Sequence, residues 1–222
     1  MKQVFYALPL VVQRGIRNLL DPGSGLERFR LIESLKTQHP TPEKLGRLRE
    51  SWGGAGVADI DYLVQVVRHA RETGGPILEC GSGLTTMLLG LYAGHPVFSL
   101  EENPYWSRRV TSALRWHRLA EVRVINAPIR AYKGFDWYTV PPDLPKQFTL
   151  VICDGPVSHQ KTGCRRYGLL PVMGPRVRGA TILMDDAKRP SEQMALERWV
   201  REFGAHVSMP EVSTRRYAVV KI

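Results

Sequence analysis

The feature that most constrains this chain is a strand, glycine turn, helix and strand in immediate succession. It comprises residues 76–86, Pro-Ile-Leu-Glu-Cys-Gly-Ser-Gly-Leu-Thr-Thr, and residues 97–101, Val-Phe-Ser-Leu-Glu. Gly81 and Gly83 let the backbone turn tightly and approach a ligand closely. Glu101 ends the second apolar run, where a carboxylate accepts hydrogen bonds from ribose hydroxyls. The pattern predicts a site for a nucleotide-type ligand.

Two further residues indicate which ligand this is. A dinucleotide site needs a third glycine where this chain has Thr86, and Glu79 would repel a pyrophosphate. A carboxylate at position 79 instead suits a cationic ligand that carries an ammonium and a sulfonium group. Together with the glycine turn and Glu101, it resembles motif I of the class I S-adenosylmethionine-dependent methyltransferases. The form Leu-Glu-Cys-Gly-Ser-Gly-Leu-Thr-Thr resembles that of one branch of small bacterial members.

The resemblance implies S-adenosyl-L-methionine as the cofactor and assigns its contacts to the ends of four expected strands. The expected cofactor-binding residues are Glu79, Gly81, Ser82, Gly83, Thr85, Thr86, Glu101, Asn126, Ala127 and Asp154.

Apolar runs and amphipathic segments alternate through the rest of the chain, which indicates an α/β fold with a mostly parallel sheet covered on both faces. Strands are expected over 77–80, 97–101, 121–126, 147–153, 180–184, 205–209 and 217–222. Helices are expected over 84–92, 105–119 and 191–203, with a short one within 165–176. The resemblance implies a Rossmann-like, doubly wound, seven-stranded sheet whose C-terminal strand is antiparallel, with a turn near Ser213 and Thr214.

The chain is expected to have two parts. Residues 1–56 form an N-terminal helical extension or lid with accessory helices at 26–36 and 42–52, and residues 57–222 form the cofactor-binding domain. The apolar stretch 4–12 is too short to span a bilayer. Residues 1–20 are expected to dock as a helix on the domain or on a partner subunit, with weak peripheral membrane contact as the alternative.

Cysteine usage and charge limit the compartment and the partners. Three cysteines without paired metal spacing indicate a reduced, cytoplasmic protein. The formal charge of +10 favours anionic partners in general, and no RNA-binding motif accompanies it. A small-molecule or glycan acceptor is therefore the first choice and nucleic acid the second. The basic pairs 165–166 and 188–189 follow strands at the expected active-site edge, where they bind substrate or are simply solvated.

Three acids end adjacent expected strands: Asp154 after the fourth, and Asp185 and Asp186 after the fifth. Converging carboxylates suit a hard cation such as Mg²⁺, which would lower the pKa of a substrate hydroxyl. This resembles metal-dependent O-methyltransferases of the sugar and catechol types. The alternative is that the acids cap loops or orient the cofactor.

His159 follows Asp154 on the same expected loop, and a histidine suits proton removal near neutrality. The expected catalytic residues are therefore Asp154, His159 and Asp185. The aromatic segment 132–138 is a candidate acceptor platform or adenine wall.

These patterns predict an S-adenosylmethionine-dependent methyltransferase acting on oxygen of a small or carbohydrate-like acceptor. Methylation of RNA or other nucleic acid is the alternative within that class. Two other classes stay open: a nicotinamide-dependent oxidoreductase, which uses the same strand–turn–helix, and a non-catalytic nucleic-acid-binding module, which would use the charge.

Overall fold

The computed structural model describes residues 22–53, 57–158, 163–210 and 217–222. The boundary between two compact units falls after Ile60. In the part of the chain that is described, no helix has both the length and the apolar character needed to cross a membrane. Residues 1–20 and the turn expected near Ser213 and Thr214 lie outside the described residues.

The first unit contains the helices α3 (Pro22–Leu35) and α4 (Pro42–Trp52). Thr41 caps the first turn of α4 through its side chain, and the helix begins with a proline, whose missing N–H costs nothing there. Arg28 of α3 donates to the backbone oxygen of Ser51 in α4, at 2.6 Å. The expected helix 42–52 therefore has these bounds in the structure.

The second unit is built on a seven-stranded sheet of order β3-β2-β1-β6-β7-β9-β8. Its strands are β1 (Ile77–Cys80), β2 (Val97–Glu101), β3 (Val122–Asn126), β6 (Leu150–Cys153), β7 (Thr181–Met184), β8 (His206–Ser208) and β9 (Ala218–Lys221). The strand β9 lies antiparallel between β7 and β8, and β3, β2, β1, β6 and β7 pair in parallel. This confirms the expected doubly wound sheet with an antiparallel C-terminal strand.

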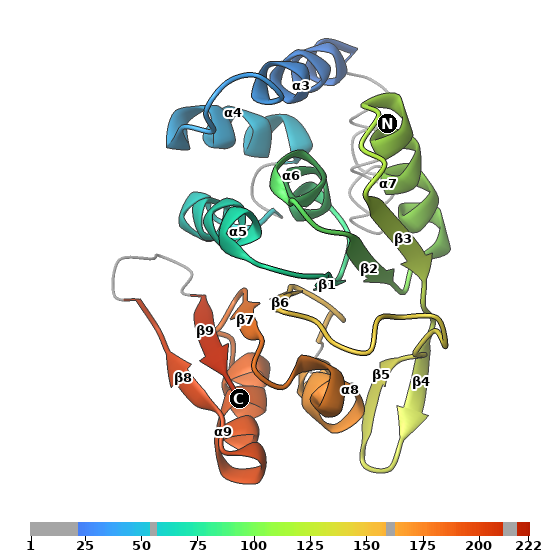
Figure 1. Ribbon diagram of the computed structural model, residues 1–222, viewed down its shortest axis with the longest axis vertical. Coiled ribbons are helices and arrows are strands. Elements are labelled where there is room, and N and C mark those ends of the chain that lie inside the picture. The colour runs from blue at the N-terminus through green and yellow to red at the C-terminus, as the bar shows by residue number, and fades with distance from the viewer. Residues whose placement is uncertain (1–21, 54–56, 159–162, 211–216) are drawn as a thin grey trace, which may run out of the picture. The chain divides into compact units, whose positions relative to one another are not determined.

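Helices cover both faces of the sheet, as Figure 1 shows. On one face lie α5 (Ile60–Glu72), α6 (Leu84–Tyr92) and α7 (Pro104–Trp116); on the other lie α8 (Leu169–Val177) and α9 (Pro190–Phe203). Because both faces are covered, every residue of the central strands β1 and β6 is buried, which explains why all of them except Glu79 are apolar.

One element was not expected from the sequence. The strands β4 (Ile129–Tyr132) and β5 (Phe135–Tyr138) form an antiparallel hairpin whose turn contains Gly134 at φ +86°. Trp137 is fully buried beside Gly168, where a Cβ would lie 2.6 Å from the Trp137 side chain. The aromatic segment is thus a hairpin that contributes to the core. The segment 165–176 forms the short 3-10 helix η2 (Arg165–Gly168) followed by α8.

Candidate functional site

The candidate site lies where the order of the sheet reverses, between β1 and β6. In open α/β sheets, ligands bind at the carboxyl ends of the strands at this switch point. The loops after the two strands are joined, because the N–H groups of Asp154 and Gly155 both donate to the carbonyl oxygen of Cys80, at 3.0 and 2.6 Å. Gly81 has φ +89°, and a Cβ there would lie 3.0 Å from the nitrogen of Gly155. Only glycine lets the two loops meet this closely.

Glu79 anchors the glycine loop from below. Its side chain is fully buried in β1, and its two carboxylate oxygens accept hydrogen bonds from the hydroxyls of Thr85 and Thr86, at 2.6 and 2.7 Å. The Thr86 hydroxyl also accepts from the N–H of Gly83, at 2.7 Å. Burial raises the pKa of Glu79 to about 7, although the threonine hydroxyls oppose the shift. Thr85 and Thr86 are themselves buried, so their hydroxyls hold Glu79 and the loop.

Gly83 lies on the side of the same loop that faces open space. A Cβ built on it meets no heavy atom within 4 Å, in contrast to Gly81. The backbone at this position therefore borders free space at the start of α6, where helix N–H groups and the helix dipole favour negatively charged or hydrogen-bond-accepting groups of a ligand. A ligand lying against the loop would occupy the space that a side chain at Gly83 would fill.

Glu101 ends β2 beside that loop and is almost fully buried. One carboxylate oxygen accepts from both the N–H and the hydroxyl of Ser82, at 2.9 and 2.8 Å, and the other accepts from the N–H of Asn103 at 2.9 Å. Burial raises the pKa of Glu101, while these bonds lower it. Oε1 keeps an acceptor direction for a ligand hydroxyl. The side chain of Asn126, at the end of β3, donates to the Glu101 carbonyl at 3.1 Å.

The expected cofactor-binding residues are thus gathered at one edge of the sheet. The N–H of Ala127 also donates to the carbonyl oxygen of Glu101, at 2.8 Å. The ends of β1, β2, β3 and β6 therefore contribute Glu79 with the glycine loop, Glu101, Asn126 with Ala127, and Asp154. Their contacts with a ligand stay a prediction.

Asp154, Asp185 and Asp186 also come together, with one carboxylate oxygen of each within 4.8 Å of the others. A fourth side chain, Arg166, lies among them. Its guanidinium is 3.2 Å from Oδ1 of Asp154 and 3.7 Å from Oδ2 of Asp186, and it donates to the backbone oxygens of Asp154 and Asp185, both at 2.6 Å. The Arg166 side chain is only 2% exposed.

Two more charged residues complete this cluster. Glu192, at the start of α9, is fully buried and lies 3.5 Å from Nε of Arg166. Arg189 is half-exposed and pairs with Oδ2 of Asp186 at 2.8 Å. Two guanidinium groups therefore balance at most two of the four carboxylate charges.

Protonation offsets part of the remaining negative charge. Burial, and then the neighbouring Asp154 and Asp186 carboxylates, raise the pKa of Asp185 to about 8. Desolvation raises the pKa of Asp154 to about 6, with Arg166 opposing the shift. The Asp154 side chain is 36% exposed, whereas that of Asp186 is 11% exposed and Asp185 is buried. Asp154 is therefore the member of the expected triad that best reaches solvent.

The cluster does not fit a divalent cation well as it stands. Carboxylate oxygens are suitable donors for Mg²⁺. Arg166 and Arg189, however, already pair with Oδ1 of Asp154 and Oδ2 of Asp186 and place positive charge beside the site. The guanidinium groups thus supply positive charge where Mg²⁺ was expected. Binding of Mg²⁺ stays a prediction that the structure does not test.

One expected catalytic residue is not described by the structure, and two charged residues of the cluster were not expected from the sequence. His159 lies outside the described residues, so its catalytic role stays a prediction. Arg166 and Glu192 were missed as members of the site. The basic pair 165–166 was placed at this edge, but its sequence does not show that one arginine is buried and the other pairs with Glu102 at 3.7 Å.

No protein-family model and no curated protein matches the chain. Solved structures do resemble it. A Staphylococcus aureus protein assigned as a caffeoyl-CoA O-methyltransferase is 15% identical over 89% of this chain and 100% of its own, with a TM-score of 0.60. The N-terminal domain of human METTL16 in complex with SAH is 12% identical over 92% of this chain and 95% of its own, with a TM-score of 0.52. Precorrin-6y C5,15-methyltransferase from Geobacter metallireducens is 14% identical over 74% and 88%, with a TM-score of 0.52.

Proposed function

We propose that this chain, which has the fold of the class I S-adenosylmethionine-dependent methyltransferases, methylates an oxygen of a small-molecule or carbohydrate-like acceptor. The observation that carries the proposal is the glycine loop held between two buried acids. Glu79 supports the loop from β1, and Glu101 binds Ser82 of the loop from β2. This arrangement suits a ligand with a ribose and a cationic side chain.

The described residues fit S-adenosylmethionine, which supplies a methyl group activated by its sulfonium. The free space at Gly83 admits the ligand to the loop, and the remaining acceptor direction of Glu101 suits a ribose hydroxyl. Glu79 is fully buried beneath the loop, so its main effects on the ligand come from its negative charge and from its hold on the loop. Asn126 is held at the end of β3 by its hydrogen bond to the Glu101 carbonyl, and we propose it as a further ligand contact.

The residues that follow β6 and β7 are suited to remove the proton of the acceptor. Asp154 is the partly exposed carboxylate at this edge. Its Oδ1 accepts a hydrogen bond from Arg166, which fixes the orientation of the carboxylate. A carboxylate in this position can accept the proton of the acceptor hydroxyl while the hydroxyl oxygen forms its bond to the methyl carbon. Burial and the neighbouring carboxylates raise the pKa of Asp185, so its protonated form is suited to donate a hydrogen bond to the acceptor oxygen. No step requires a metal ion.

The proposal is tested first by calorimetry with S-adenosylhomocysteine. Glu101→Ala should weaken binding by about 1–3 kcal/mol, because charge-assisted hydrogen bonds to the ligand are lost. Glu102→Ala is the matched control, since Glu102 points to Arg165 at 3.7 Å and should leave affinity unchanged. Because Glu101 also holds Ser82, Glu101→Gln is the milder companion variant. Unchanged affinity in both Glu101 variants contradicts the assignment, and binding of NADH in place of S-adenosylhomocysteine favours an oxidoreductase.

A nucleic-acid acceptor is the second candidate. It is favoured by the formal charge of +10 and by arginines on the exposed side of α7, including Arg108 and Arg115. Binding of RNA oligonucleotides that weakens steeply with salt, together with methyl transfer to them, would establish it. Methyl transfer to hydroxyl compounds with RNA binding absent would favour the small acceptor.

A further inference from the structure

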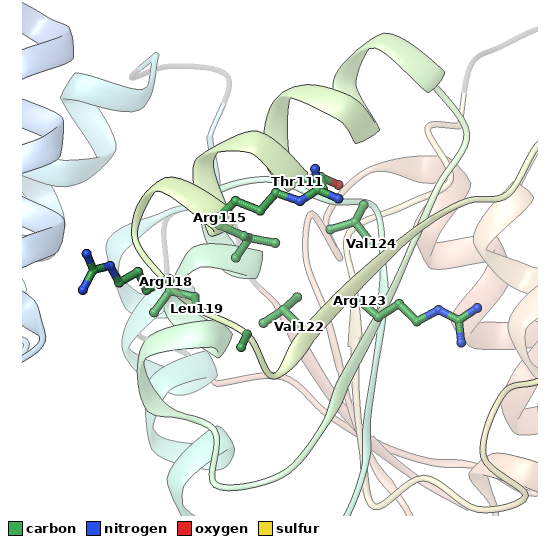
Figure 2. Close-up of a pocket in the computed structure, with 9 residues that line it drawn as sticks. Thr111, Arg115, Arg118, Leu119, Val122, Arg123 and Val124 are labelled. Atoms are coloured by element: carbon green, nitrogen blue, oxygen red, sulfur yellow. The ribbon is translucent and has the colours of Figure 1, made fainter.

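A pocket away from the candidate site lies between the C-terminal part of α7 and β3, at one edge of the sheet (Figure 2). Its volume is about 570 Å³. It is lined by Thr111, Leu114, Arg115, Arg118, Leu119, Ala120, Val122, Arg123 and Val124. The lining thus combines aliphatic side chains with three arginines, and it contains no aromatic ring.

The backbone of β3 faces this edge. β3 pairs with β2 on one side, and within the described residues no strand pairs with its other side. The N–H of Val97 donates to Glu121 and that of Ala127 donates to Glu101, so the odd-numbered residues of this segment point their backbone groups toward β2. By alternation, the N–H and C=O groups of Val122 and Val124 point outward. They form a template for one additional strand.

The arginines give this edge its charge. Arg123 pairs with Asp143 at 2.5 Å, whereas Arg115 and Arg118 have no ion pair within the described part of the chain. Figure 2 shows Arg115 extended along α7, and Arg118 and Arg123 pointing away from each other. The guanidinium groups are therefore spread along the strand and do not converge on one point.

We infer that the open edge of β3 binds an extended acidic segment of a partner protein, which adds a strand to the sheet. Its backbone would pair with Val122 and Val124, its apolar side chains would enter the aliphatic pocket, and its carboxylates would meet Arg115 and Arg118. Pairing with a second copy would oppose arginine to arginine. Single-stranded nucleic acid is disfavoured because the pocket offers no ring on which a base stacks.

The test uses a fluorescein-labelled seven-residue peptide, Thr-Glu-Thr-Val-Thr-Glu-Thr, whose valine and glutamates share one face of a strand because side chains alternate. It is titrated with the full chain and followed by anisotropy. Binding is expected at low salt, and Arg115→Ala with Arg118→Ala together should raise the Kd about three- to ten-fold, as expected for two exposed ion pairs. Arg108→Ala, on the same helix but outside the pocket, is the matched control and should leave the Kd unchanged.

Two further arms separate strand addition from simple charge attraction. Val124→Pro removes an outward N–H without removing a bond to β2, so it should abolish peptide binding while the melting temperature and S-adenosylhomocysteine affinity persist. A peptide N-methylated at alternate residues should not bind. Binding that survives both changes overturns the inference, as does absence of binding at millimolar peptide or tighter binding of a single-stranded oligonucleotide. Since S-adenosylhomocysteine affinity is measured separately, failure here is distinguishable from failure of the proposed function.

Discussion

The Thr86 hydroxyl lies 2.7 Å from Oε2 of Glu79 and 2.7 Å from the nitrogen of Gly83, so one hydroxyl links a buried acid to the glycine loop. Dinucleotide-binding loops have glycine at the position of Thr86 for close packing. Here the side chain is needed because it donates to Glu79 while it accepts from Gly83. The departure from the dinucleotide pattern is therefore part of how the loop is held.

The first prediction concerns this hydroxyl. Thr86→Val keeps the shape of the side chain but removes the hydrogen bonds that its hydroxyl makes with Oε2 of Glu79 and with the N–H of Gly83, so it should destabilise the protein by about 1–3 kcal/mol. Thr85→Val is the control, because Thr85 bonds only to Glu79 and its loss should cost less. Urea denaturation measures both. Equal costs would show that the bond to Gly83 contributes nothing.

The second prediction concerns the charge of Glu79. Its pKa is about 7 in the folded protein and 4.5 ordinarily, so the native state holds the proton more tightly than the unfolded chain. Stability from this carboxyl is fully present below pH 4.5 and is lost as the pH rises through about 7, by up to about 3 kcal/mol. Glu79→Gln cannot ionise. The free energy of unfolding of Glu79→Gln minus that of the natural protein should therefore be larger at pH 8 than at pH 5.

The same substitution should have the opposite effect on the cofactor. The carboxylate form of Glu79 attracts a cationic ligand, so Glu79→Gln should weaken S-adenosylmethionine binding at pH 8 and flatten its rise between pH 6 and 8. Taking the difference between the two proteins at each pH cancels most of the contribution of Asp154 and Asp185, which also titrate. Parallel affinity curves for both proteins would contradict the role of Glu79.

The third prediction separates the two loop glycines. A Cβ at Gly83 meets nothing within 4 Å, so Gly83→Ala should change stability by no more than about 0.5 kcal/mol yet weaken S-adenosylhomocysteine binding. Gly81→Ala should unfold at lower temperature, because position 81 has φ +89° and its Cβ would press on Gly155. Thermal melts with calorimetry check both. Normal binding by Gly83→Ala would show that no ligand lies against this loop.

The sheet was largely predictable because its strands are short apolar runs between glycine, proline and polar residues. The hairpin of β4 and β5 was missed, although Lys133-Gly134 between alternating residues is a turn signal. Its aromatic side chains were interpreted as a ligand surface, whereas Trp137 fills space that Gly168 leaves open. Such a contact joins residues distant in sequence, and local patterns do not contain it.

The candidate site was predictable to the same degree. The ends of β1, β2, β6 and β7 follow from the strand pattern, so Glu79, Glu101 and the three aspartates were placed correctly at one edge. The burial of Arg166 was not predictable. An arginine in a basic pair is usually solvated, and only the packing of η2 against the strand ends places it among the acids.

The last prediction concerns Arg166 as the internal cation of this cluster. Arg166→Met removes the positive charge, so Asp154 and Glu192 lose their ion pair and Asp186 keeps only that with Arg189. Breaking a buried ion pair in this way costs about 3–5 kcal/mol. Added Mg²⁺ should then raise the melting temperature of the variant, because the freed carboxylates bind the ion only in the folded state. The natural protein should respond neither to Mg²⁺ nor to chelator. Arg165→Met is the control, since Arg165 pairs with Glu102 and not with this cluster.

Measurements on the natural protein test whether Mg²⁺ binds this cluster even if Arg166→Met fails to fold. A melting temperature of the natural protein that rises with Mg²⁺, or methyl transfer that stops with chelator and recovers with the ion, would show that a metal binds beside Arg166. Indifference of both measurements would assign the charge compensation to the arginine. The acceptor's proton would then pass to a protein group, Asp154 or His159, and Asp154→Asn should lower the rate without changing S-adenosylhomocysteine affinity by more than a few-fold.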